Sequence, residues 1–278
     1  MPLKPQVGFL GIILLLVLSC DLSPIEETEL YPATIQALDS TELLELNRIY
    51  QKKNNDYICS TLNEFGFTGF SRVLFVDGKS PCDTKTIPKI ELPYSDELLD
   101  RAREAIVFNS EFTNVRNSWQ LVLKEVLPLY DCTICEEPLI NSVITQWRFT
   151  FENQTKDNIE VYDTEISVYV DALGVNRIWG NWHEIYAPDF IEVGYVTAKE
   201  KLIGKTLSYE DENGEVIQQE ITATDLGENP YKKYVPAVNN NTLQLHLCWV
   251  IEISLHSTDE VKWKEFVDVK SGEIVKNN

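Results

Sequence analysis

The residues whose type and spacing most clearly suggest a chemical role are the cysteines, of which the chain has six. Cys132 and Cys135 form a Cys-x-x-Cys pair, the spacing of a redox dithiol, of half a zinc site or of a disulfide across a tight loop. A redox pair needs a lowered thiol pKa, but Glu136 and Glu137 follow directly and would raise it. No second Cys or His pair has zinc spacing. The pattern favours a loop disulfide, with redox and metal roles as alternatives.

Cys20 has a different setting, at the end of an apolar run near the start of the chain. Lys4 supplies a positive charge, and the apolar residues extend from about Val7 to Leu18. A charged start, an apolar core and a small residue before the cut are the parts of an export signal. The run is about 12 residues long, whereas a membrane-spanning helix needs about 20. We therefore expect cleavage directly before Cys20.

A cysteine directly after such a cut resembles the bacterial lipoprotein box. The resemblance implies that residues 1–19 are a lipoprotein signal peptide and that Cys20 is acylated and becomes the mature N-terminus. It also implies an exported protein of the bacterial cell envelope, held in a membrane by its lipid, with the outer membrane as the expected location. The alternative is an ordinary secretory signal followed by a structural cysteine.

The five cysteines after Cys20 are expected to form disulfides, because an exported protein can keep them. An odd number leaves at least one thiol unpaired. The favoured pairing joins Cys59 to Cys82 and Cys132 to Cys135, which leaves Cys248, although the sequence alone does not determine the connectivity. Cys248 falls on the polar side of its expected strand, either covered by a helix or open to pairing.

The net charge and the motifs of the sequence argue against several classes of function. The net charge is −20, and nucleic-acid binding needs clustered Lys and Arg, so we expect no nucleic-acid partner. The three histidines, His183, His246 and His256, are scattered and are expected to be ordinary surface residues. The sequence has no G-x-S-x-G, P-loop, G-x-G-x-x-G or His-Glu-x-x-His motif. We therefore assign no catalytic residue, metal ligand or cofactor.

Apolar periodicity predicts the elements that must carry any site. Helical spacing and capping residues predict helices over about 40–51, from Ser95 onward, over about 115–126 and over about 197–204. Period-two alternation predicts strands at 71–76, 145–152, 166–171, 175–179, 243–253, 261–269 and 273–275. Asn213-Gly214 predicts a further hairpin, and this turn is a better interpretation of residues 211–215 than a calcium loop.

The order of these elements predicts an α+β fold, with helices packed on antiparallel sheets. Residues 20–35 are acidic, contain proline and are expected to be a tether. A small N-terminal segment, 36–94, follows. Helix-then-meander then occurs twice, which predicts two similar lobes at 95–189 and 190–278.

Both lobes resemble known families in short motifs. Trp147–Gln154 and Ile166–Asp171, continuing to Gly174, are similar to the propeptide module of thermolysin- and fungalysin-like proteases. Leu245–Ile253 and Trp263–Val275, with Asp268, Ser271, Gly272 and Ile274 at the final turn, are similar to a PepSY domain. The resemblance covers about 97–278 and implies a body that binds proteins or peptides or inhibits a protease, without catalysis. No protease sequence follows it.

The predicted function is therefore a lipid-anchored envelope protein with a non-catalytic module for a protein or peptide partner. An envelope hydrolase that uses acidic residues and a structural envelope component are the alternatives. The richest aromatic cluster, Arg177–Tyr186, is expected mainly to pack in the core. Trp179 and Trp182 can face opposite sides, which would leave one of them exposed to a partner or a glycan.

Overall fold

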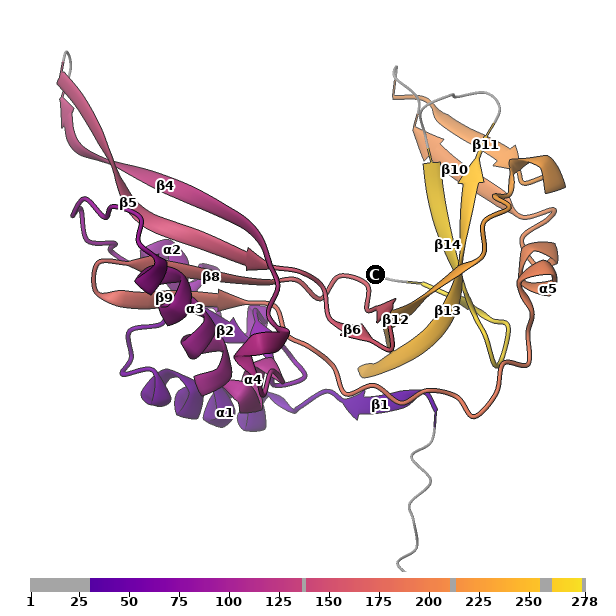
Figure 1. Ribbon diagram of the computed structural model, residues 1–278, viewed down its shortest axis with the longest axis horizontal. Helices are drawn as coiled ribbons and strands as arrows, with labels where there is room; N and C mark the ends of the chain where they lie inside the picture. Colours follow the sequence, from indigo (N-terminus) through magenta and orange to yellow (C-terminus); the bar gives the residue numbers. More distant parts are fainter. Residues whose placement is uncertain (1–30, 137–138, 211–213, 256–261, 277–278) are drawn as a thin grey trace, which may run out of the picture. The chain divides into compact units, whose positions relative to one another are not determined.

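The computed structural model describes residues 31–136, 139–210, 214–255 and 262–276, with the backbone alone at 133–136, 139–141 and 262. Residues 31–278 form one compact unit. The fold is α+β with antiparallel sheets, as predicted (Figure 1). Cys20 and the predicted signal peptide lie outside the described residues. No helix within the described ranges has the length and hydropathy to cross a membrane.

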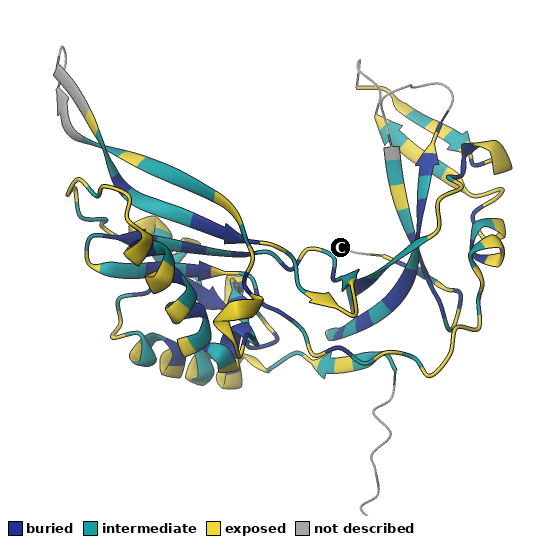
Figure 2. Ribbon diagram, in the orientation of Figure 1, coloured by how far each residue is buried: buried dark blue, intermediate teal, exposed yellow. Residues whose placement is uncertain are grey.

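The first sheet is antiparallel and contains, in spatial order, β4 (Leu123–Glu136), β5 (Leu139–Phe151), β8 (Ile166–Asp171) and β9 (Gly174–Trp179). The α3 helix (Asp96–Phe108) packs across β5, β8 and β9. Phe149 and Phe151 on β5 are completely buried, as are Ala102 and Ile106 on α3. Figure 2 shows such buried positions along the strands. Period-two alternation on the strands and helical spacing on α3 thus supply one shared core.

The residues before α3 belong to the same core and do not form a separate segment. The α1 helix (Ser40–Lys53) begins with a capping box, in which Asp39 and Glu42 bond each other's main-chain N–H groups. Leu43 and Tyr50 on α1 join the core that contains β5 and β8. The short elements between α1 and α3 are β2 (Thr61–Leu62), β3 (Thr68–Gly69), the 3-10 helix η1 (Arg72–Leu74) and α2 (Pro81–Thr84). A short α4 (Ser110–Thr113) follows α3.

The second sheet is built around β13 (Thr242–Ser254). The strand β12 (Tyr231–Asn239) pairs along one edge of β13, while β1 (Ala33–Gln36) and β14 (Lys262–Asp268) share the other edge. The sheet ends at β15 (Ile274–Val275). The α5 helix (Tyr195–Glu200) contributes Ala198 to a core that also contains Ile251 and Val267.

The remaining elements are short. The hairpin β10 (Thr206–Glu210) with β11 (Val216–Glu220) confirms the hairpin predicted at Asn213-Gly214, although Asn213 lies outside the described residues. The other two-stranded pair is β6 (Thr155–Lys156) with β7 (Ile159–Glu160). The 3-10 helices η2 (Ser118–Gln120) and η3 (Ala223–Asp225) complete the described elements. Val161, directly after β7, forms a parallel bridge with Tyr234 of β12, which links the two halves of the chain.

Four expected elements are corrected by the structure. The predicted tether at 20–35 includes β1, because Ala33 to Gln36 pair with β13. The predicted strand at 71–76 is instead the 3-10 helix η1. The predicted helix at 115–126 is η2 followed by the start of β4, and its supposed core residue Trp119 is 78% exposed. The helix near residue 197 was placed two residues late, since α5 begins at Tyr195.

The disulfide that joins Cys59 to Cys82 across 23 residues is expected to stabilise the fold. A cross-link over a loop of this length constrains the unfolded chain and stabilises the fold by about 3 kcal/mol. We expect the free energy of unfolding of the double variant Cys59→Ala/Cys82→Ala to be lower by this amount, as measured by urea unfolding followed by circular dichroism. A loss below about 0.5 kcal/mol would show that the cross-link contributes little.

Candidate functional site

Asp171, at the end of β8, is completely buried and satisfies a tight turn. Its Oδ1 accepts hydrogen bonds from the main-chain N–H groups of Leu173 (2.8 Å) and Gly174 (3.1 Å). Its Oδ2 accepts one from the Tyr57 hydroxyl and one from the Asn176 amide, each at 2.6 Å. The carboxylate therefore caps its own turn and also holds the segment that carries Tyr57.

Asp268, at the end of β14, repeats this arrangement in the second sheet. Its Oδ1 accepts from the main-chain N–H groups of Lys270 (2.8 Å) and Ser271 (2.7 Å). The Tyr31 hydroxyl donates to Oδ2 at 2.6 Å, and Nδ1 of His246 lies 2.9 Å from the same oxygen. An ionised carboxylate only accepts, so His246 Nδ1 carries the proton of this bond. The Asp-x-x-Ser-Gly motif is thus a structural turn.

The electrostatics of Asp268 agree with a structural role. Burial by itself would raise the pKa of this carboxyl, but bonds from His246, Tyr31 and the turn N–H groups hold the pKa well below its usual range. Burial and the neighbouring Asp268 carboxylate raise the pKa of Tyr31 far above its usual range. The pair is therefore a permanent phenol–carboxylate hydrogen bond.

Cys248, His246 and Asp268 could be mistaken for a catalytic set, because they lie on one face of neighbouring strands. Cys248 is a free cysteine, completely buried beside Val235 and Val250. Its Sγ lies 3.8 Å from the main-chain oxygen of His246. Burial, with a smaller contribution from Asp268, raises the pKa of the thiol strongly, so the thiolate required of a nucleophile is disfavoured.

The Cys-x-x-Cys pair lies on the β4–β5 hairpin, where Cys132 pairs with Ser142 and Cys135 with Ile140. Cys132 is disulfide-bonded, whereas the side chain of Cys135 lies outside the described residues. The pair is in a strand, without the helix N-terminus that lowers the pKa of a redox thiol. Within the described ranges, no three His, Cys, Asp or Glu residues are grouped as metal ligands.

The histidines differ from their predicted surface setting. His246 has only 16% of its side chain exposed and bonds Asp268. His183 is partly buried, and burial lowers its pKa to about 4. Its ring packs edge-on against Phe67, with centroids 6.3 Å apart. The prediction was wrong for both residues, because each lies beneath a segment distant in sequence, while His256 lies outside the described residues.

An aromatic pocket with a volume of about 270 Å³ lies beside β3, η1 and β9. The rings of Trp179 and Phe70 stack with centroids 5.1 Å apart, and these side chains are 43% and 46% exposed. Phe75 lies next to Phe70, and the Cys59–Cys82 disulfide joins the two sides of this region. The pocket is lined by Ser60, Thr61, Gly69, Phe70, Phe75, Ser80, Cys82, Asp83, Arg177 and Trp179.

Among the described residues, two buried polar atoms beside this aromatic pocket have no hydrogen-bond partner. Thr61 Oγ1 and Arg177 Nε are buried and unpaired, and both residues line the pocket. The guanidinium of Arg177 lies over the Tyr169 ring, 4.7 Å from its centroid, which fixes its orientation. Buried polar groups are normally satisfied, and an unpaired one costs about 1–3 kcal/mol.

Sequence reasoning identified part of this pocket. Trp179 and Trp182 face opposite environments, as predicted, since Trp182 is only 6% exposed. Arg177 was noted only as the start of the aromatic cluster, and Phe70 and Phe75 were missed. The expected strand at 71–76 would have placed Phe75 on a sheet, whereas Phe75 directly follows η1 and its ring packs against Phe70, which stacks on Trp179.

Comparisons with known proteins add little. No protein-family model matches the chain, and no curated protein matches it. The Bacillus megaterium YpeB C-terminal domain is 13% identical, with a TM-score of 0.27, and the match covers 68% of each chain. An uncharacterized protein from Eubacterium rectale ATCC 33656 is 12% identical, with a TM-score of 0.25, over 72% of this chain and 60% of that one. Neither similarity carries a functional argument.

The low pKa of Asp268 predicts sensitivity to acid. Its folded pKa lies below the unfolded value, so the stabilisation is complete above about pH 4 and is lost as the pH falls through the folded pKa. At pH 7, the free energy of unfolding of Asp268→Asn should be lower than that of the unmodified protein by about 1.5–3 kcal/mol. On acidification to about pH 2, the variant should lose less of its stability than the unmodified protein does. Urea unfolding at several pH values measures both.

The control for this prediction is Asp100→Asn, which removes an aspartate that is 69% exposed on α3. Its pH dependence should follow that of the unmodified protein. If Asp268→Asn and Asp100→Asn gave the same stability profile, Asp268 would not be the acid-sensitive group.

Proposed function

We propose that this chain is a lipid-anchored protein of the bacterial envelope whose PepSY-like body binds a protein or peptide without catalysis. The aromatic pocket is the observation that carries the proposal. It combines two half-exposed stacked rings, Phe70 and Trp179, with the unpaired polar atoms of Thr61 and Arg177.

The exposed rings have the chemistry of an interface anchor. Tryptophan and other large aromatic residues dominate binding energy at protein interfaces, particularly where they border a pocket. Trp179 and Phe70 offer a rigid apolar face, since their rings already pack against each other. A partner side chain that covers this face removes apolar surface from water. Because the two rings are already packed, binding costs little conformational entropy in the pocket.

The pocket size favours a side chain of a partner over an independent small molecule. Its volume of about 270 Å³ is below the about 300–1,000 Å³ typical of small-molecule sites. One apolar or aromatic side chain fits such a space. The lining also includes Ser80, Asp83 and Arg177, whose polar groups can hydrogen-bond peptide N–H and C=O groups, which supports a protein or peptide as the partner.

The PepSY-like part of the proposal is supported by the final turn. Asp268, Ser271 and Gly272 are the residues of the family-like ending, and Asp268 organises the turn through Ser271 N–H. Asp171 and Gly174 form the matching turn in the first sheet. In the part of the chain that the structure describes, the buried aspartates are Asp171, Asp225 and Asp268, and all accept hydrogen bonds in turns or caps.

The lipid anchor is supported by the sequence around Cys20. An acidic body with a net charge of −20 is repelled by anionic lipid, so membrane attachment requires an anchor of another kind. Acyl chains on Cys20 supply about 0.8 kcal/mol per buried CH₂, and two or three chains hold a protein firmly. The expected location is the outer membrane.

Truncation of the exposed ring tests the binding proposal. Trp179→Ala should weaken partner capture at least about 30-fold, because a central aromatic anchor contributes about 2 kcal/mol or more. The partner is first isolated from solubilised envelope by cross-linking through a photoreactive residue at position 70, and its affinity for both proteins is then measured by titration.

Trp119→Ala is the matched control, since Trp119 is 78% exposed and lies outside the pocket. It should bind the partner as the unmodified protein does. Equal affinity of Trp179→Ala and Trp119→Ala, with both variants folded by circular dichroism, would refute the role of the aromatic pocket.

The anchor has its own test. Cys20→Ser removes the acylated thiol, so palmitate labelling and membrane retention should both be lost in cells that express the full chain. Cys248→Ala, which removes a buried free thiol, should label and fractionate normally. A Cys20→Ser protein that still incorporates palmitate and stays in the membrane would contradict the lipoprotein proposal.

A further inference from the structure

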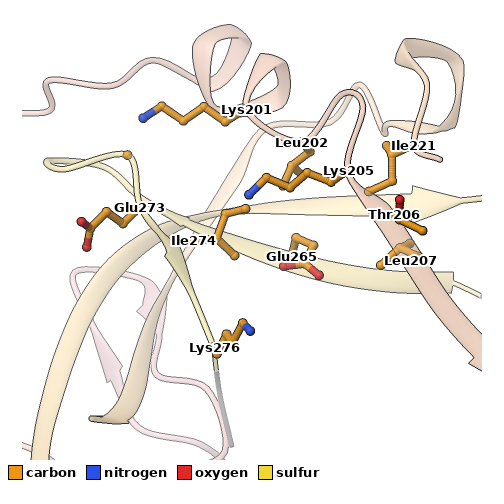
Figure 3. A pocket seen from close by; sticks show the side chains of 11 residues that line it. Lys201, Leu202, Lys205, Thr206, Leu207, Ile221, Glu265, Glu273, Ile274 and Lys276 are labelled. Carbon is orange, nitrogen blue, oxygen red and sulfur yellow. The ribbon is translucent and has the colours of Figure 1, made fainter. Parts of the chain in front are cut away.

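We propose that a second pocket, rimmed by lysines beside α5, binds an acidic peptide segment. The lysine pocket has a volume of about 770 Å³ and lies between the residues that follow α5 and the last strands of the second sheet (Figure 3). It is lined by Lys201, Leu202, Lys205, Thr206, Leu207, Ile221, Glu265, Gly272, Glu273, Ile274 and Lys276. This inference goes beyond the proposed function, because none of its residues contributes to the aromatic pocket.

The floor of the lysine pocket is apolar. Leu202 and Ile221 are buried and belong to the core beneath α5, and Leu207 and Ile274 pack against that core. Figure 3 shows Ile274 beside the polar rim side chains. A ligand that enters the pocket therefore meets a surface suited to an aliphatic side chain, at about 25 cal/mol for each Å² removed from water.

The rim concentrates positive charge on an acidic protein. The chain has 24 Lys and Arg against 44 Asp and Glu, yet three lysines line this pocket against two glutamates, Glu265 and Glu273. Among the described residues, Lys201, Lys205 and Lys276 form no ion pair. Lys201 extends over Gly272, where any Cβ would collide with its ammonium group. The charge complement of this rim is a carboxylate-bearing ligand.

Glu265, which lines the pocket beside this apolar floor, distinguishes a peptide from an acyl chain. It is partly buried, and burial raises the pKa of its carboxyl despite the opposing charges of Lys205 and Lys276. Within the described ranges, it accepts no hydrogen bond. A fatty-acid chain laid here would bury this carboxylate without a partner, at a cost of about 1–3 kcal/mol or more. A peptide supplies main-chain N–H donors for Glu265 and acidic side chains for the lysines.

The test uses the full chain and a fluorescein-labelled ten-residue peptide of alternating glutamate and leucine. Fluorescence anisotropy at low salt should show saturable binding, and the same peptide with glutamine in place of glutamate should bind at least about tenfold more weakly. The variant Lys201→Gln/Lys205→Gln should also lose about tenfold in affinity for the acidic peptide.

The matched control is Lys52→Gln/Lys264→Gln, which makes the same charge change at two exposed lysines outside the pocket. It should bind like the unmodified protein. Glu265→Gln should bind the acidic peptide more tightly, since it removes a competing negative charge and keeps an acceptor. Equal affinities of the pocket and control variants would overturn the proposal, as would binding of phosphatidylglycerol vesicles through these lysines without binding of the peptide.

A failure of this test leaves the aromatic pocket unaffected, because the two sites are changed by different variants. Conversely, loss of partner binding in Trp179→Ala says nothing about peptide binding at the lysines. The two proposals are thus distinguishable by which substitution alters which ligand.

Discussion

The structure depends on two buried carboxylates that each complete a turn and receive a tyrosine hydroxyl. Asp171 closes the turn between β8 and β9, and Asp268 closes the turn between β14 and β15. Each carboxylate accepts main-chain N–H groups of its own turn through Oδ1 and accepts side chains, including a tyrosine hydroxyl, through Oδ2. A buried carboxylate is tolerated only when its oxygens accept hydrogen bonds. The first sheet therefore requires the segment that carries Tyr57, and the second sheet requires the segment that carries Tyr31.

This constraint explains how segments distant in sequence join the sheets. The Tyr31 hydroxyl donates to Asp268 and also accepts from Leu247 N–H, at the gap between β1 and β14 along the edge of β13. Tyr31 and Asp268, whose pKa values are strongly shifted, are both engaged at one of these turns and have structural roles. The aromatic pocket and the lysine pocket are the surfaces that we propose for recognition.

Local signals made much of the fold predictable from sequence. The capping box before α1 and the alternating residues of β5, β8 and β13 are local, and those elements formed where expected. The helix expected at 115–126 failed because Trp119 and Val122 are spaced like core residues but are exposed. The pockets depend on long-range contacts: Thr61 meets Arg177 only after the β2–β3 hairpin docks, and Lys205 meets Lys276 only after β15 forms. The spacing of residues along the chain does not predict these long-range contacts.

The most direct test of the account is a double-mutant cycle on Tyr31 and Asp268. The unfolding free energies of Tyr31→Phe, Asp268→Asn and the double variant are compared with that of the unmodified protein at neutral pH. The account predicts a coupling energy of about 1.5–3 kcal/mol, because the phenol donates to an ionised and buried carboxylate. Additive effects, with a coupling below about 0.5 kcal/mol, would show that the carboxylate does not hold the N-terminal strand and would contradict the account.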